Sequence, residues 1–599
     1  MTYRAPLPEI IFAMRAVGGL DSRIADGLYA DLADGTAEQI LAEAAKFAED
    51  VLDPINRSGD LAGSKISDGK VTTPAGWIEA YRQWEAGGWS GLTASTEDGG
   101  MGLPQLLNAA CQDMWMSANM AFMLCPMLAA GAIEALAAHG SATLQKSWLP
   151  KIVSGEWATT MNLTEPQAGS DLAALRTRAA RAGDGTYRIT GQKIFITYGE
   201  HDLTDNIVHL VLARLPDAPA GTRGISLFLV PKFLLNADGL PGALNDLRCA
   251  GIEHKMGIHA SPTCTMVFGD NGGATGWLIG EENRGLACMF TMMNNARLGV
   301  AMQGVAMAER ATQHALAYAN ERRQGRAPGW TGDGMSPIVQ HPDVRRTLLT
   351  MKSMTAAVRA LAYLTAATAD LAHRGGDEAQ RKYHAERVAL LTPVAKAFST
   401  DVGNEVTSMG VQVFGGMGFI EETGAAQFMR DARIAAIYEG TNGIQAIDLV
   451  QRKLGLSGGE TMRREIADMR TIMAEVAAVN APSFGRTAQR MTEAIDALER
   501  ATHWMMTAQT SAVDDALAGA TPYLRLFGIA RGGASLAGLA LAAHQLGEGG
   551  DRDPAHAPRI ALARFFAENV AVTSTGLEQM VTQGAASVKD GADALAVLS

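Results

Sequence analysis

The sequence predicts an α+β fold whose parts follow in the order helices, β domain, helical bundle and helical extension. At 599 residues the chain is too long for one hydrophobic core, so several domains are expected. Its 47% hydrophobic and 19% charged residues are typical of a soluble globular protein. Apolar residues recur with a helical period on both sides of a stretch rich in β-forming residues. We therefore expect domains at residues 1–157, 158–280, 281–454 and 455–599.

The first of these domains is expected to be helical. Helical patterns cover residues 37–51, 77–86, 106–137 and 142–152, and a turn-rich segment at 97–104 interrupts them. The sequence contains no βαβ alternation, which argues against a dinucleotide-binding Rossmann domain.

The second domain is expected to be all β. Its runs of β-forming residues are short, and Gly, Pro, Asn and Asp separate them. The runs are residues 187–190, 194–197, 207–213, 225–230 and 264–268.

Long helical periods return after residue 281 and continue to the end of the sequence. Leu298, Met302 and Val305 share one helical face. The apolar stretch 526–546 includes Arg531, so we expect a buried helix there and not a membrane span. The segments long enough to form a bundle are residues 294–320, 343–372 and 385–409.

Charge and cysteine content argue against several classes of function. A net charge of −12 disfavours nucleic acid as a partner, because binding it needs a basic surface. The five cysteines are scattered and contain no CxxC pair, which argues against a disulfide framework and a metal site. Charged residues and prolines interrupt the first 20 residues, so these do not read as a secretory signal, and a cytoplasmic location is expected.

Three segments could bind a phosphate group or the flat ring of a ligand. Residues 161–171 end in a Gly-Ser-Asp turn with free backbone N–H groups, although capping a helix is the commoner use of such a turn. Phe195 and Thr197 lie two apart on a predicted strand and should face one side, as most sheet-packing pairs also do. Residues 412–416 form a glycine-rich turn that lets backbone approach a pyrophosphate, but no strand precedes it.

A fourth segment, residues 430–443, contains Glu439 between Tyr438 and Gly440. Apolar residues 434–437 precede it. A carboxylate in such surroundings can have a raised pKa and act as a general base. The alternative is a salt-bridged loop glutamate.

Together these segments resemble the acyl-CoA dehydrogenase family. They occur in the family's order across roughly residues 40–454, on the helix–β–helix layout of that family. The resemblance implies a β-barrel-like central domain, with FAD between it and the C-terminal bundle. The matching segments read LTEPQAGSD at 163–171, GQKIFIT at 191–197, ARLGVAMQG at 296–304, YANERRQG at 318–325, QVFGGMGF at 412–419 and RDARIAAIYEGTNGIQ at 430–445.

The resemblance also assigns roles to single residues. Glu439 matches the catalytic base, and Arg322 matches an arginine that reaches the FAD of a neighbouring subunit, which implies a homo-oligomer, expected to be a dimer. Thr197 matches the threonine near flavin N5. The other implied FAD contacts are Met161, Thr164, Ser170, Phe195, Gln412, Gly415, Gly416 and Thr441. The implied substrate contacts are Ser170, Arg297, Tyr438 and Gly440.

The sequence departs from the family pattern at three places. Some branches place the base immediately before the arginine that matches Arg297, and here Ala296 occupies that position. Gly325 replaces the phenylalanine of the family's R-x-x-F-G box, and an insertion follows at 327–337. Residues 455–599 extend beyond the end of compact relatives, as in a bacterial subgroup of about 600 residues.

The implied reaction is FAD-dependent α,β-dehydrogenation of a short- or medium-chain acyl-CoA to the trans-2-enoyl-CoA. An electron-transferring flavoprotein would accept the electrons. Residues 1–14, 199–219 and 253–264 look closest to the family branch that acts on 3-methylmercaptopropionyl-CoA in dimethylsulfoniopropionate breakdown. The alternatives are a general short- or medium-chain fatty acyl-CoA dehydrogenase of β-oxidation, an acyl-CoA oxidase with the same base and flavin, and a DNA-binding flavoprotein of this fold.

Overall fold

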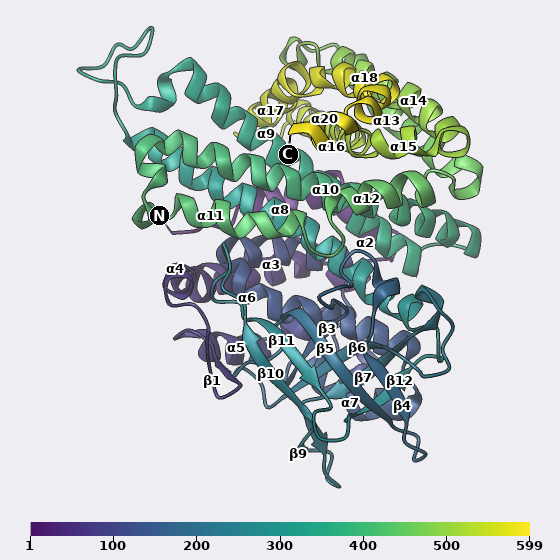
Figure 1. The fold of residues 1–599 in the computed structure, drawn as a ribbon. Coiled ribbons are helices and arrows are strands. Elements are labelled where there is room, and N and C mark those ends of the chain that lie inside the picture. The colour runs from purple at the N-terminus through teal and green to yellow at the C-terminus, as the bar shows by residue number, and fades with distance from the viewer. Residues whose placement is uncertain (1, 599) are drawn as a thin grey trace.

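The structure is a computed structural model that describes residues 2–598. The β domain lies at one end of the molecule, with the N-terminal helices next to it (Figure 1). The long helices of the bundle lie beyond them, and the C-terminal helices pack on the bundle. The α+β fold predicted from the sequence is confirmed.

The N-terminal part is helical apart from one small hairpin. Its elements are α1 Leu7–Ala16, α2 Leu20–Ala25, α3 Thr36–Phe47, α4 Asp53–Ala62, β1 Lys65–Ser67, β2 Lys70–Thr72, α5 Trp77–Ala86, α6 Gln105–His139 and α7 Ala142–Ser154. The sequence predicts one helix over residues 106–137. The structure has two helical arms there, because the backbone of Asn119 is not helical (φ −156°, ψ 88°). The Asn119 side chain accepts a hydrogen bond from Phe122 N at 3.1 Å and so caps the second arm. The two arms fold back until Gln105 reaches Glu134.

The central part is an eight-stranded sheet that closes on itself. Strand β4 pairs with both β5 and β6, which completes the ring β5–β12–β7–β6–β4. Strands β6 and β7 are buried along almost their whole length, as expected of strands covered on both faces. The strands are β3 Trp157–Asn162, β4 Arg178–Arg181, β5 Tyr187–Thr197, β6 Asn206–Arg214, β7 Ile225–Pro231, β10 Leu247–Ile252, β11 Thr263–Phe268 and β12 Ala274–Ile279, with the separate hairpin β8 Phe233–Leu235 and β9 Pro241–Leu244.

The bundle is built from three long helices and two short ones. They are α8 Gly285–Glu321, α9 Pro342–Arg374, α10 Glu378–Phe414, α11 Ala425–Ala432 and α12 Asn442–Asp448. Helix α8 packs on both α6 and α10, so it joins the bundle to the N-terminal helices. The connection between α8 and α9 projects from the body of the molecule (Figure 1).

The C-terminal extension packs on the bundle through α16, which contacts α9, α10 and α12. The packing is close, because a Cβ at Gly528 would lie 2.3 Å from the Phe398 ring. The helices of the extension are α13 Glu460–Val479, α14 Thr487–Ser511, α15 Val513–Ala518, α16 Ala520–Glu548, α17 His556–Asn569, α18 Ser574–Gln583, α19 Ala585–Asp590 and α20 Ala592–Leu598.

Two helices, α6 and α16, have the length and apolar composition of a membrane span. The most apolar windows of these helices are 83% and 89% buried inside the fold. Both are therefore core helices here, as the sequence predicted for residues 526–546. All five cysteines of the sequence are buried and unpaired within the part of the chain that the structure describes.

Candidate active site

Glu439 lies in the loop between α11 and α12, which we call the base loop (residues 433–441). Its backbone is left-handed, with φ +57°, and Gly440 follows at φ +80°. A residue with a side chain costs about 1–3 kcal/mol in a sparsely populated backbone conformation. The surrounding structure must therefore hold Glu439 in place.

Hydrogen bonds to backbone carbonyls hold the base loop. The Glu439 carbonyl accepts bonds from Gln445 Nε2 at 3.1 Å and Arg297 Nε at 3.4 Å. The Gly440 carbonyl accepts a bond from Lys396 Nζ at 2.9 Å. Thr441 ends the loop as the N-cap of α12, with its hydroxyl accepting from Ile444 N at 3.2 Å. Position 440 favours glycine because its φ is +80°, and a Cβ there would also displace the Gln445 amide nitrogen, 2.7 Å away, which holds the Glu439 carbonyl.

The environment of Glu439 suits a general base. Burial raises the pKa of its carboxyl above the ordinary value, and Arg297 and Lys396 act in the opposite direction. The side chain is half-buried and so keeps some surface open to a ligand. Ala296, which occupies the alternative base position on α8, is buried and has no proton-accepting group.

Two more polar side chains connect the base loop to the N-terminal helices. Tyr438 donates a hydrogen bond to Gln303 Oε1, and Gln303 Nε2 lies 3.4 Å from Met127 Sδ. Met127 in turn packs on Gly299, where a Cβ would lie 2.8 Å from Met127 Sδ. This row of contacts runs from the base towards the space between α6 and α8.

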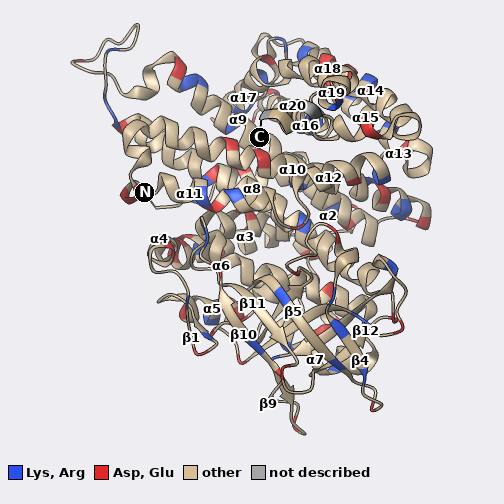
Figure 2. Ribbon diagram, in the orientation of Figure 1, with Lys and Arg blue, Asp and Glu red and all other residues tan. Residues whose placement is uncertain are grey.

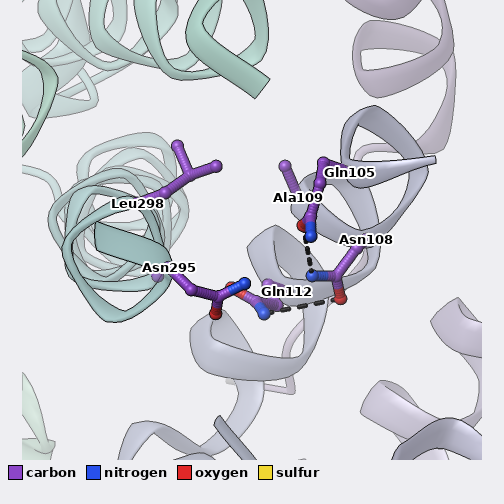
Figure 3. A pocket seen from close by; sticks show the side chains of 7 residues that line it. Gln105, Asn108, Ala109, Gln112, Asn295 and Leu298 are labelled. Carbon is purple, nitrogen blue, oxygen red and sulfur yellow. Dashed lines mark hydrogen bonds between the residues drawn. The ribbon is translucent and has the colours of Figure 1, made fainter. Parts of the chain in front are cut away.

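That space contains a small cavity lined by amides (Figure 3). It measures about 10 Å³, enough for about one water molecule. Gln112 donates to Asn108, Asn108 to Gln105, and Gln105 to Glu134, at 3.4, 3.2 and 3.1 Å. Asn295 donates to the same Glu134 oxygen at 2.8 Å. No local sequence pattern indicates this amide row, because its members come from three helical segments.

Glu134, at the end of the amide row, should make the folding stability depend on pH. Burial raises the pKa of Glu134 to about 7, despite the hydrogen bond from Asn295. The native state then binds a proton that the unfolded state has released, so stability falls as pH rises from about 4.5 to about 7. We expect Glu134→Gln to remove this slope and to raise stability at pH 8 by at most about 3 kcal/mol.

Urea denaturation at a series of pH values measures this effect. The matched control is Glu79→Gln on α5, an exposed glutamate whose replacement should leave the slope in place. An unchanged slope in Glu134→Gln would show that another group causes it.

The β domain contributes a second group of predicted residues. Phe195 is 58% exposed and has φ +60°, which is unusual for an aromatic residue on a strand. The pairing of β5 with β11 shifts register here, since Ile196 pairs with Cys264 and Lys193 with Met266. The regular alternation assumed for Phe195 and Thr197 is therefore interrupted by a bulge.

The turn after β3 contains Thr164 and Ser170, and Thr164 contacts this strand. The Thr164 carbonyl accepts from Ile194 N at 2.9 Å, and Ser170 is exposed. Beneath the turn, Glu165 is buried and pairs with Lys193 at 2.9 Å. Met161 lies at the end of β3 and is half-buried.

The remaining predicted residues lie at another end of the bundle. Arg322 caps α8 at its C-terminus, about 38 Å along the helix from Arg297 at 1.5 Å per residue. Gln412, Gly415 and Gly416 are exposed at the end of α10, and a Cβ at either glycine would meet no atom within 4 Å. One chain therefore does not bring these four residues to Glu439.

The comparisons with known proteins cover nearly the whole chain. It matches the acyl-CoA dehydrogenase N-terminal domain over residues 35–156, the middle domain over 160–271 and the C-terminal domain over 283–454. Residues 466–590 match a domain described as acetyl-CoA dehydrogenase C-terminal like.

Two relatives match along almost their full length. The 3-methylmercaptopropionyl-CoA dehydrogenase of Ruegeria pomeroyi is 46% identical, over 97% of this chain and 98% of the relative. The broad-specificity linear acyl-CoA dehydrogenase FadE5 of Mycobacterium tuberculosis is 33% identical, over 97% of each chain. Among solved structures, Caenorhabditis elegans ACDH-11 in complex with C11-CoA has a TM-score of 0.76 at 19% identity, covering 94% of this chain and 91% of that one.

Proposed function

The chain belongs to the acyl-CoA dehydrogenase family, and we propose that it dehydrogenates 3-methylmercaptopropionyl-CoA, with Glu439 as the base. It is an oxidoreductase of a family that binds FAD. One observation carries the choice of substrate. The relative from Ruegeria pomeroyi that bears this activity in its name is 46% identical over 97% of the chain, whereas the broad-specificity FadE5 is 33% identical over the same share. The butyryl-CoA dehydrogenase of Syntrophomonas wolfei, by comparison, matches 72% of it at 40% identity.

The residues present fit FAD. The Phe195 ring is 58% exposed, in a strained backbone conformation, and offers a flat apolar face on the same strand as Thr197, next to the turn that contains Thr164. We propose that Met161, Thr164, Ser170, Phe195 and Thr197 hold the flavin from this side, and that Thr441 contacts it from the base loop. When bound, FAD supplies the acceptor for the hydride that leaves the β-carbon of the thioester.

The protein's own part in the reaction is to take the α-proton. The α-proton of a thioester is only weakly acidic, so its removal needs a base whose pKa lies near the working pH. Burial of Glu439 brings its pKa in that direction. The backbone N–H of Glu439 can donate to the thioester carbonyl as negative charge develops on that oxygen. We propose that Arg297, Tyr438, Gly440 and Ser170 line the thioester site.

The distant residues support an oligomer. Arg322, Gln412, Gly415 and Gly416 are exposed and far from Glu439 in one chain, so we propose that they contact the FAD of a partner subunit in a homodimer. Analytical ultracentrifugation of the holoprotein tests this, since a monomer that retains FAD and activity would contradict it. We further propose a cytoplasmic protein that passes electrons to an electron-transferring flavoprotein.

The alternatives make different predictions. A DNA-binding flavoprotein needs a basic face. In this chain the basic residues are interspersed with acidic ones (Figure 2), and the net charge is −12. An acyl-CoA oxidase would share the base and the flavin. Rapid reaction of the reduced, product-bound protein with O₂ would identify it.

Anaerobic titration of the holoprotein with saturated acyl-CoAs tests the proposed function. The panel includes 3-methylmercaptopropionyl-CoA, butyryl-CoA and octanoyl-CoA, and loss of the flavin absorbance is the readout. We expect the first thioester to reduce the flavin fastest. If butyryl-CoA reduces it faster, the general short-chain alternative is correct, and if no thioester reduces it, the dehydrogenase assignment fails.

A further inference from the structure

Lys396 is a buried cation that the proposed chemistry leaves unexplained. It lies in the middle of α10, and its side chain has no exposed surface. Its ammonium donates to the Gly440 carbonyl and to Asn442 Oδ1, both at 2.9 Å. Burying an ammonium is costly unless its hydrogen bonds are satisfied, so an apolar residue would serve packing better at this position.

The neighbouring turn of α10 binds Asn442, the first residue after the base loop. The Asn442 amide donates to the Ala397 carbonyl at 3.1 Å, to Thr400 Oγ1 at 3.0 Å and to Asp401 Oδ1 at 2.7 Å. Lys396 binds the amide oxygen of the same side chain. Helix α10 therefore fixes both ends of the segment 440–442 that follows the base.

Three elements together constrain the backbone at Glu439. Arg297 on α8 and Gln445 on α12 bind the carbonyl of Glu439 itself, while Lys396 on α10 binds the next carbonyl. Glu439 is held at φ +57°, where a side chain is strained. The bond from Lys396 opposes relaxation of this strain on the C-terminal side.

We propose that Lys396 is a positioning residue for the reaction: its ammonium keeps the base loop in the conformation that aims Glu439 and favours the ionised form of that base. The proposal rests on Glu439 being the base. Lys396 does not touch the thioester in this scheme and acts only through the loop.

The charges around Glu439 and Lys396 agree with this role. The charges of Arg297 on α8 and Lys396 on α10 act on Glu439, and the neighbouring Tyr438 hydroxyl is bonded to Gln303. Around Lys396 the charged groups are Glu439, Asp401 and Arg297, while Asp448 and Arg452 act on Arg297. Burial lowers the pKa of Lys396 to about 7, against the pull of Glu439 and Asp401, so the charge is present below that pH.

Three substitutions separate position from charge. Lys396→Gln keeps a hydrogen-bond donor for the Gly440 carbonyl but removes the charge. Lys396→Met removes both the donor and the charge. Lys396→Arg keeps both. We expect the pKa of Glu439 to rise by about 1 unit in the Gln and Met variants, because an opposite charge is lost nearby. The value of kcat/KM at pH 6.5 should fall about 10- to 100-fold in Lys396→Met, since a charged hydrogen bond is lost. The loss should be smaller in Lys396→Gln, and Lys396→Arg should recover the wild-type pKa.

Two measurements read these effects in the FAD-loaded protein. The pH profile of kcat/KM gives the pKa of the base kinetically. The infrared C=O band of a protonated carboxyl, assigned by its loss in Glu439→Gln, gives the same pKa without turnover. Lys382→Met, which removes an exposed lysine from the same helix, is the control for charge alone and should shift neither.

An unchanged Glu439 pKa in both neutral variants would overturn the proposal, as would an equal shift in Lys382→Met. If Lys396→Met does not fold, Lys396→Gln and Lys396→Arg still give opposite expectations for the pKa. Failure of the proposed function looks different. Either no acyl-CoA then reduces the flavin of the wild type, or Glu439→Gln keeps the wild-type rate, whatever the Lys396 variants do.

Discussion

Glu439→Gln is expected to lower kcat for acyl-CoA dehydrogenation by about 10²- to 10⁴-fold, the usual contribution of a general base. Glutamine fills the same volume and can take the same backbone bonds from Arg297 and Gln445, so the base loop should keep its conformation. FAD content and thioester affinity should therefore change little. Stopped-flow reduction of the flavin by 3-methylmercaptopropionyl-CoA measures the effect directly.

Glu439→Asp is the matched control for this experiment. Aspartate keeps a carboxylate and tolerates the left-handed backbone better than most residues, but its carboxyl is one methylene further back. We expect activity between those of wild type and Glu439→Gln. Flavin reduction in Glu439→Gln within tenfold of the wild-type rate would rule out Glu439 as the base.

The pH dependence of the wild-type enzyme has a defined sign. The base must be ionised to accept the α-proton, and burial raises the pKa of Glu439. The rate should therefore rise with pH through that pKa, above the range of an ordinary glutamate. The pH dependence of the folding stability has the opposite sign. The folded state favours the protonated carboxyl, and this advantage is lost as pH rises through the same pKa.

The sequence could single out Glu439 as the proposed base because this residue and its flanking residues are contiguous. Ile437, Tyr438, Gly440 and Thr441 form one short motif, and their backbone places the carboxylate. The prediction that Phe195 and Thr197 contact the flavin has the same basis. The layout of helices and strands was also accessible, because long periodic segments fix the type of an element even where its ends are uncertain.

The residues that contact the base loop from a distance could not be predicted in this way. Lys396 and Gln303 are separated from the base by 43 and 136 positions, and each looks like an ordinary residue of a long helix. Only the packing of α8 and α10 around the base loop brings them there. Local backbone exceptions were missed as well, since the kink at Asn119 and the bulge at Phe195 depend on partners elsewhere in the fold.

The C-terminal extension acts on the bundle that carries these residues. Arg531 on α16 pairs with Glu465 and Asp468 on α13, and Arg387 on α10 binds the same two carboxylates. Helix α16 also packs on α12, directly after the base loop. The extension therefore braces the side of α10 and α12 from which the base loop is held.

Arg359→Leu is expected to destabilise the protein by about 3–5 kcal/mol, because it leaves buried carboxylates without their partner. Arg359 on α9 bonds to Asp113 on α6 at 2.6 Å and to Glu309 on α8 at 3.1 Å, and all three side chains are almost completely buried. Tyr363 donates a further bond to Asp113 at 2.9 Å. This cluster ties the N-terminal helices to the bundle, so its loss should loosen both.

Arg346→Leu is the matched control, since it removes an arginine from the exposed part of the same helix. Its pair with Asp343 is open to solvent and should be worth less than about 1 kcal/mol. Urea midpoints measured by circular dichroism compare the two variants. The wild type should also lose stability as pH falls from about 4.5 to about 2, because Lys352 and Arg359 outweigh burial and hold the pKa of Glu309 at about 2. Equal midpoints for Arg359→Leu and Arg346→Leu would mean that the buried cluster adds nothing beyond a surface pair, and that apolar packing alone joins α6, α8 and α9.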